Sequence, residues 1–315
     1  GITYAFTTKK GIFSLFLQKA YKSVSSSADV MEGVYSWKIS KHLSGWLIVV
    51  LFLLSLSGLS QPFVAKKRLK TAGQTFTSFD GTKIYYEVRG QGEPVVLIHG
   101  FTSTGESWKK SPAYILLLQN GFQVITLDLR GNGQSDKPHE AKAYEQNAEV
   151  KDVMDLTTRL RLKKYLVVGY SRGAIIAAEL ITKDKRIKKA VLGGMGPDFT
   201  NPEWPRRILF YQALRGDSVP ELADFMKSVK DRGLDQVALA YQQKAQPATS
   251  PTALAKVKIP VLVISGKKDN DNGIAEDLAK LIPYGKSMRV PGNHNSTLQS
   301  EAFAEALTAF LLSGL

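Results

Sequence analysis

The chain has 315 residues, of which 43% are hydrophobic, and its formal net charge is +14. This length is enough for one globular domain with a large buried core, and the absence of cysteine excludes disulfides, thiolate metal sites and a cysteine nucleophile. Basic clusters such as residues 159–164 and 183–189 are typical of solvated helix faces and ends rather than of a DNA-binding stripe. No nucleic-acid partner is therefore predicted.

An uninterrupted apolar run, residues 46–54, lies near the start of the chain and continues to Leu59. We interpret residues 1–73 as a leader that contains a signal or anchor segment at about 43–65. A signal peptide would be cleaved near residue 60, whereas an anchor would keep the stretch as one membrane span. The sequence therefore predicts either an exported protein, periplasmic or extracellular, or attachment to a membrane through residues 43–65. The basic residues that follow the run argue against simple export.

The remaining residues, 74–315, are predicted to form one domain in which strands alternate with helices. The first two strands, within residues 75–90, are expected to form a hairpin at Asp80-Gly81. Further strands are expected at residues 94–101, 122–131, 164–171, 187–194, 259–266 and 286–292. Helices are expected at residues 106–121, 143–162, 172–182, 272–283 and 296–313.

The predicted strands are short and apolar along their whole length, which is typical of a parallel sheet covered by helices on both faces. We therefore predict an α/β fold with a doubly wound, mostly parallel sheet. Residues 194–256 interrupt the alternation, because they are rich in proline and helix-like and contain no convincing strand. We expect them to form a small helical lid inserted after the sixth strand.

One short segment carries the strongest chemical signal. Residues 169–173 read Gly-Tyr-Ser-Arg-Gly at the point where a predicted strand passes into a predicted helix. The serine could be incidental to a tight turn. In this context, however, G-x-S-x-G is typical of a nucleophile elbow, in which Gly169 and Gly173 let the turn close and Ser171 projects its hydroxyl above the carboxyl edge of the sheet. Such a serine needs a histidine as base and an acid to orient that histidine.

The base and the acid follow from their positions in the chain. The four histidines, His42, His99, His139 and His294, are not spaced as metal ligands, so no metal site is predicted. His294 lies between the last predicted strand and the last predicted helix, which makes it the candidate base by position and by elimination. The acid should follow a strand between the serine and the histidine. Asp269 satisfies this condition, with Asp271 as the alternative, and either could instead cap a helix.

The order Ser171, Asp269, His294, together with this elbow, resembles the α/β-hydrolase superfamily over about residues 75–315, in the serine-nucleophile branch of esterases and meta-cleavage hydrolases. Residues 99–101, His-Gly-Phe, resemble the loop after the third strand of that family, and residues 128–138 resemble the turn after its fourth strand.

The resemblance also implies roles for the residues around Ser171. The backbone amides of Phe101 and Arg172 would form an oxyanion hole, supported by His99 and Gly100. Epoxide hydrolases and haloalkane dehalogenases carry aspartate at the elbow, so the serine at position 171 disfavours those chemistries.

The function that the resemblance implies is a serine hydrolase that forms an acyl-enzyme on a small ester-like substrate, with no metal or organic cofactor. A carbon–carbon bond hydrolase, a thioesterase and a perhydrolase stay open, as does a ligand receptor or scaffold with residual hydrolysis. No oligomeric state or acyl length is predicted. Five aromatic residues of the expected lid either line an acyl pocket or pack the lid onto the body: Trp204, Phe210, Tyr211, Phe225 and Tyr241.

Overall fold

The computed structural model describes residues 73–314. The predicted leader, with its apolar segment at 43–65, lies outside the described residues except for Gly73, so the signal or anchor stays a prediction. Within residues 73–314, none of the helices combines the length and the apolar character needed to cross a bilayer.

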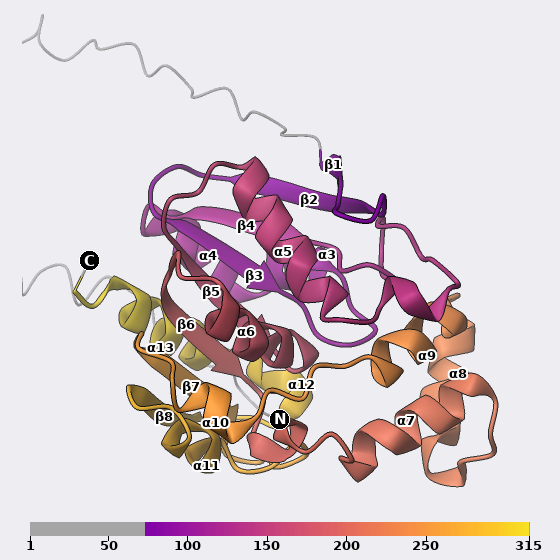
Figure 1. The fold of residues 1–315 in the computed structure, drawn as a ribbon. Coiled ribbons are helices and arrows are strands. Elements are labelled where there is room, and N and C mark those ends of the chain that lie inside the picture. The colour runs from indigo at the N-terminus through magenta and orange to yellow at the C-terminus, as the bar shows by residue number, and fades with distance from the viewer. Residues whose placement is uncertain (1–72, 315) are drawn as a thin grey trace, which may run out of the picture. The chain divides into compact units, whose positions relative to one another are not determined.

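Eight strands form a single sheet in the order β1-β2-β4-β3-β5-β6-β7-β8 (Figure 1). β1 and β2 form the predicted antiparallel hairpin, β2 is also antiparallel to β4, and every other neighbouring pair is parallel. This topology confirms the doubly wound, mostly parallel sheet. The strands are β1 (Gln74–Thr77), β2 (Lys83–Arg89), β3 (Pro94–Ile98), β4 (Gln123–Leu127), β5 (Tyr165–Tyr170), β6 (Ile187–Gly193), β7 (Val261–Gly266) and β8 (Gly285–Val290).

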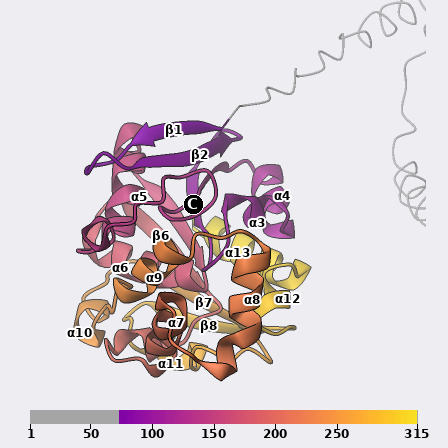
Figure 2. The ribbon, with the colours of Figure 1, turned by 90° about the vertical axis from the view of Figure 1, so that its right-hand side faces the viewer.

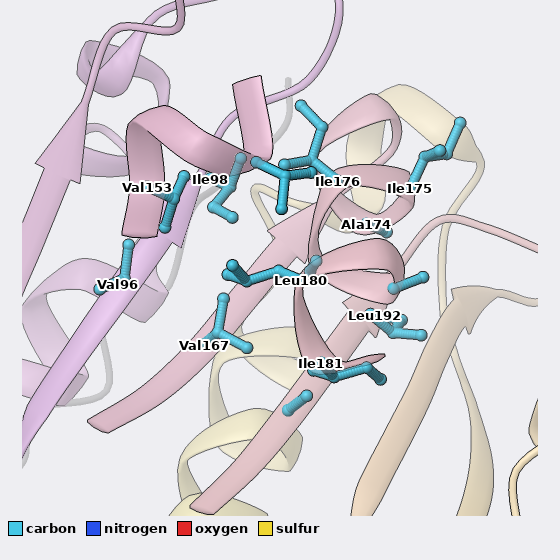
Figure 3. Close-up of a cluster of buried hydrophobic side chains, with 14 of the residues drawn as sticks. Val96, Ile98, Val153, Val167, Ala174, Ile175, Ile176, Leu180, Ile181 and Leu192 are labelled. Atoms are coloured by element: carbon cyan, nitrogen blue, oxygen red, sulfur yellow. The ribbon is translucent and has the colours of Figure 1, made fainter. Parts of the chain in front are cut away.

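The central strands are apolar throughout because both faces of the sheet are buried. Side chains alternate between the two faces along a strand. In β3, Val96 and Ile98 pack into a first hydrophobic core on one face of the sheet, whereas Val95 and Leu97 pack into a second core on the opposite face. Figure 3 shows the first core, where strand side chains such as Val96 and Ile98 meet Val153 and the apolar face of the helix that follows Ser171.

Helices cover both faces, as the prediction required. The first core contains residues of α5 (Ala148–Arg159), α6 (Arg172–Lys183) and α11 (Ala275–Lys280). The second contains residues of α3 (Gly105–Lys109), α4 (Pro112–Gln119) and α13 (Glu301–Leu312).

Two of the predicted helices are interrupted in the structure. The helix expected at 106–121 is divided into α3 and α4, because Pro112 has no backbone N–H and forces Ser111 into an extended conformation with φ −86° and ψ 147°. The last predicted helix is preceded by the short α12 (His294–Thr297), and α13 starts at a separate cap, where the Ser300 side chain accepts a hydrogen bond from the Phe303 amide.

A helical insertion connects β6 to β7, as expected after the sixth strand. It comprises η2 (Pro197–Thr200), α7 (Pro205–Arg215), η3 (Pro220–Leu222), α8 (Ala223–Asp231), α9 (Gln236–Lys244) and α10 (Pro251–Leu254). Figure 1 shows α7, α8 and α9 grouped on one side of the sheet, and they face the viewer in Figure 2. The insertion has a small core of its own around Leu214, Val229 and Leu239, and Phe101 of the sheet body packs against it.

Candidate active site

Ser171 occupies the sharp corner between β5 and α6. Its backbone has φ 55° and ψ −122°, a conformation that is costly for a residue with a side chain. The two glycines of the motif make the corner possible. A Cβ on Gly169 would lie 2.1 Å from the carbonyl oxygen of Gly173, and a Cβ on Gly173 would lie 2.1 Å from that of Ile98. The Ser171 amide also donates to the Gly193 carbonyl at 2.8 Å, so neighbouring strands hold the strained residue in place.

Three of the predicted residues form one hydrogen-bonded line. Ser171 Oγ lies 2.9 Å from His294 Nε2, and His294 Nδ1 lies 3.1 and 3.0 Å from the two carboxylate oxygens of Asp269. His294 begins α12 after β8, and Asp269 follows β7 and is only 2% exposed. With the imidazole proton on Nδ1, His294 donates to Asp269 and accepts the hydroxyl proton of Ser171.

The alternative acid, Asp271, does not hydrogen-bond to His294 within the described part of the chain, and its side chain is exposed. It does bring a carboxylate oxygen near the pair: one ligand atom each from Asp269, Asp271 and His294 lie within 4.8 Å of one another. Both ring nitrogens of His294 are already engaged, however, one with the carboxylate and one with the serine. The same side chain therefore cannot bind a metal ion without giving up one of these contacts.

Two supporting residues were not found from the sequence. Tyr170, the residue before the nucleophile candidate, donates its hydroxyl proton to the His294 carbonyl at 2.6 Å, and its ring lies 5.6 Å from the imidazole. Arg289 of β8 donates to the carbonyl oxygens of Gly266 and Asp269 at 3.0 and 2.9 Å, so it holds the loop that presents the acid. The only local signal for the contact of Arg289 was an arginine in β8, a strand in which three of the six residues are exposed.

His99 shapes the loop beside the serine and takes no part in the hydrogen-bonded line. It is fully buried; its Nδ1 lies 2.8 Å from the Gly100 carbonyl, and its Nε2 lies 3.0 Å from the Leu129 amide nitrogen. The Leu129 amide can only donate, so Nε2 accepts and Nδ1 carries the proton. Burial lowers the pKa of His99 below its usual value, which keeps the ring neutral.

The two backbone amides expected to form an oxyanion hole lie at the same pocket. Gly100 packs against the serine, because a Cβ on this glycine would lie 3.3 Å from Ser171 Cβ. Phe101 and Arg172 both line the pocket that contains Ser171 and His294. Neither of these two amides donates a backbone hydrogen bond within residues 73–314, as expected at a helix start for Arg172. Both remain available to a ligand oxygen.

The Arg172 side chain ties the elbow to the insertion, a role that the sequence did not reveal. It is 3% exposed and forms an ion pair with Glu149 of α5. The same guanidinium donates to the Gln242 carbonyl at 2.8 Å and to the side-chain oxygen of Gln246 at 3.1 Å. A buried ion pair needs such additional hydrogen bonds to offset its desolvation. The position of the Arg172 amide therefore depends on α5 and on the end of α9.

The turn at 128–138 is structural. The Asp128 carboxylate accepts hydrogen bonds from the amides of Gly105 and Gln134, each at 2.8 Å. Arg130 is fully buried and pairs with Asp152 at 2.6 Å and with Asp80 at 2.7 Å. These contacts fix the end of β4 next to His99 and do not reach the serine.

The pocket at Ser171 is small, about 80 Å³. Of the five aromatic residues of the expected lid, Trp204 and Phe210 line it. Phe225 and Tyr241 contact the body, because the Phe225 ring lies 6.0 Å from that of Phe101 and the Tyr241 ring lies 5.9 Å from that of Tyr144. Tyr211 packs against the core of the insertion itself. Each alternative thus applies to two of the five residues, and Tyr211 fits neither. The insertion contributes seven residues to the pocket wall: Met195, Trp204, Arg206, Arg207, Phe210, Gln243 and Gln246.

Comparison with known proteins relates part of the chain to a known family. A family model described as the alpha/beta hydrolase fold matches residues 93–225. A protein of Synechocystis sp., named provisionally as a non-heme chloroperoxidase, is 39% identical over 134 residues, which are 40% of this chain and 47% of that protein. A non-heme chloroperoxidase of Streptomyces lividans is 33% identical over 138 residues, which are 41% of this chain and 49% of that protein. The chain thus spans about half the length of the curated relatives it matches.

Solved structures extend the similarity to most of the described residues. An esterase from Exiguobacterium antarcticum superposes with a TM-score of 0.65 at 22% identity, covering 77% of this chain and 100% of the esterase. A bromoperoxidase from Bacillus anthracis superposes with a TM-score of 0.60 at 26% identity, covering 76% of this chain and 99% of that protein. These likenesses bear on the fold.

Proposed function

The chain belongs to the α/β-hydrolase superfamily, and from this premise we propose that it is a serine hydrolase that cleaves ester-like bonds through an acyl-enzyme. One observation carries the proposal: the hydrogen-bonded line from Asp269 through His294 to Ser171, built on a strained elbow. A strained serine held by glycines and neighbouring strands is hard to explain as an incidental turn residue.

The acylation step follows from this line. His294 Nε2 accepts the hydroxyl proton as Ser171 Oγ attacks the substrate carbonyl, and the buried Asp269 carboxylate stabilises the imidazolium that forms. The carbonyl oxygen gains negative charge and accepts hydrogen bonds from the amides of Phe101 and Arg172. Donors fixed in advance at this point are commonly the largest contribution to the rate of acyl transfer.

The acyl-enzyme then breaks down with the same groups. His294 gives its proton to the leaving alcohol, and a water molecule enters the vacated position. His294 accepts a proton from this water as it attacks the ester carbon, and the Ser171 hydroxyl is restored when the carboxylic acid leaves. No step calls for a metal ion or an organic cofactor.

The size of the pocket favours a short acyl group. A water molecule needs about 10–15 Å³ of such cavity, so the 80 Å³ beside Ser171 corresponds to roughly five to eight water-sized groups. Trp204 and Phe210 provide the apolar part of the wall. We therefore expect acetyl to butyryl esters to be better substrates than octanoyl or decanoyl esters.

Perhydrolysis is the second candidate, and the names of the two curated relatives favour it. In this reaction hydrogen peroxide takes the place of water, attacks the acyl-enzyme, and leaves with the acyl group as a peracid while Ser171 regains its proton. The same three side chains would serve both reactions, so the difference lies in which nucleophile reaches the acyl-enzyme.

The experiment that tests the proposal is turnover of p-nitrophenyl esters, from acetyl to decanoyl, by the full chain and by Ser171→Ala. We expect the variant to lose at least about a thousandfold in kcat/KM while its thermal unfolding stays close to that of the wild type. Adding hydrogen peroxide and acetate to the wild type, with peracid as the readout, measures perhydrolysis. A folded wild type no faster than the variant on every ester would exclude esterase activity and leave thioester, carbon–carbon or receptor functions.

A further inference from the structure

The wall of the pocket at Ser171 carries an excess of positive charge. Arg172, Arg206 and Arg207 line it, and the described lining contains no aspartate or glutamate. Apart from Ser171 and His294, the remaining polar wall residues are Gln243, Gln246 and Asn272, which are neutral. The charge of the site therefore depends on whether each arginine is neutralised from behind.

Only one of the three arginines is neutralised. Arg172 is buried and paired with Glu149. Arg207 is half-buried, and its guanidinium donates to two backbone carbonyls, those of Lys244 at 3.3 Å and of Pro202. Arg206 lies over the Phe210 ring, 5.1 Å from its centroid. Within residues 73–314, no carboxylate lies within 4.0 Å of Arg206 or Arg207.

Two acidic residues that precede α7 in the chain do not change this result. Asp198 lines a neighbouring hollow together with Arg206 but forms no ion pair with it. Glu203 precedes the two arginines by a few positions, is exposed, and does not line the pocket at the serine. Two positive charges at the start of α7 thus face a small pocket without a protein counter-ion.

From these contacts we infer that the natural substrate carries a carboxylate, which Arg206 and Arg207 bind while Ser171 attacks an ester a few atoms away. The inference rests on the proposed hydrolase function. Guanidinium groups bind carboxylates through paired, charge-assisted hydrogen bonds. Uncompensated positive charge at a pocket mouth also raises the local concentration of anionic substrates. The 80 Å³ of space sets a short distance between the carboxylate and the ester.

Two matched substrate pairs test the inference, each comparing a carboxylate with its neutral carboxamide. Ethyl hydrogen succinate and ethyl succinamate place the group on the acyl side, and 4-acetoxybenzoate and 4-acetoxybenzamide place it on the alcohol side. With the full chain, we expect kcat/KM for the carboxylate to exceed that for the carboxamide by about tenfold in at least one pair. This ratio should fall toward one in Arg206→Gln/Arg207→Gln, mainly through KM, and should decrease in wild type as salt is added.

A control variant separates local from overall charge. Arg215→Gln/Lys230→Gln removes the same number of charges from exposed positions on α7 and α8 outside the pocket, and it should keep the wild-type preference. Turnover of the carboxamides by this control variant should match that of wild type, and thermal unfolding compared with wild type shows that both variants are folded.

The inference is overturned if wild type cleaves both carboxamides as fast as the carboxylates, or if the preference survives in Arg206→Gln/Arg207→Gln. Ser171→Ala separates failure of the carboxylate site from failure of the hydrolase proposal. Carboxamide turnover that depends on Ser171 without any anion preference refutes the carboxylate site alone. If none of the four esters reacts faster with wild type than with Ser171→Ala, the hydrolase proposal fails and the inference fails with it.

Discussion

The sheet body and the helical insertion differ in how many of their residues are buried and in what they contribute to the site. All six residues of β5 are buried, and α6 buries ten of its twelve residues. In the insertion, α7 buries only Ala213 and Leu214, and α8 buries only Val229. The hydrogen-bonded line is built entirely on the body, whereas the insertion provides much of the pocket wall. A densely packed body is suited to holding reacting groups in place, and a lightly packed insertion is suited to selecting the substrate.

The difference has an energetic basis. Dense packing on both faces resists displacement, because a shifted side chain has no empty space to enter. A segment with few buried apolar contacts opens at lower free energy than the core. If this division is correct, changes in the body should reduce the rate or the global stability, and changes in the insertion should mainly affect substrate binding.

The largest expected effect is on the acid. Asp269→Asn should lower kcat by about ten-thousand-fold, because the amide no longer fixes the His294 tautomer or stabilises the imidazolium. Asp271→Asn is the matched control, two residues away in the same loop, and should stay near wild type. The measurement is kcat on a short p-nitrophenyl ester together with thermal unfolding. Equal losses in the two variants would mean that the loop as a whole is needed, rather than the Asp269 carboxylate.

A pair of cavity variants tests the packing difference directly. Leu180 of α6 is fully buried in the body, and Leu239 of α9 is 1% exposed in the small insertion core. Leu180→Ala should lower the free energy of unfolding by about 2–5 kcal/mol. Leu239→Ala should cost less in the global transition and should raise KM more. Urea denaturation and steady-state kinetics measure both; the reverse ranking would contradict the division of labour.

The sequence predicted the body better than the insertion for a physical reason. Strands such as β3, β5 and β7 are buried on both faces, so their apolar runs are visible without knowledge of any neighbour. The elbow at Ser171 is equally local, since a strand, two glycines and a small-residue helix are adjacent in the chain. His294 was found because the carboxyl ends of parallel strands meet at one edge.

Features that depend on tertiary placement could not be predicted in this way. The ion pair between Arg172 and Glu149, and the contact of Arg172 with Gln242, join residues that no sequence pattern connects. Tyr170 holds His294 only because the end of β5 meets the start of α12, 124 residues away in the chain. The break at Pro112 is a different case, because the proline itself is a local signal for the end of a helix. The prediction of one helix at 106–121 followed the apolar periodicity instead.

The pH dependence of the free energy of unfolding tests the body at one buried residue, His99. Burial lowers the pKa of His99 below the value of about 6.5 in an unfolded chain. The unfolded state therefore binds the proton more readily, and the stability contributed by neutral His99 is present above pH 6.5 and is lost as the pH falls below it. The loss is at most about 1.4 kcal/mol per pH unit. Asp128 opposes this shift, and Arg172 reinforces it.

Two histidine variants show whether this loss of stability at acid pH arises in the body or at the insertion. His99→Gln keeps an acceptor for the Leu129 amide and should flatten the fall in stability between pH 6.5 and 5. His139→Gln removes an exposed contact to Asp235 at the start of α9 and should leave the fall unchanged. Urea denaturation at each pH measures both. A flattened profile in His139→Gln would place the acid-sensitive group in the insertion's contacts instead.

The smallest expected effect concerns the strain at the elbow itself. A side chain at φ 55° and ψ −122° costs on the order of 1–3 kcal/mol, which glycine avoids, while glycine costs about 0.5–1 kcal/mol more than alanine in chain entropy. Both Ser171→Gly and Ser171→Ala lack the hydroxyl and should be equally inactive. Ser171→Gly should nevertheless be the more stable of the two, by about 1 kcal/mol. Equal stability would mean that the backbone at the corner is not strained. The conformation of Ser171 would then no longer support its role as a nucleophile.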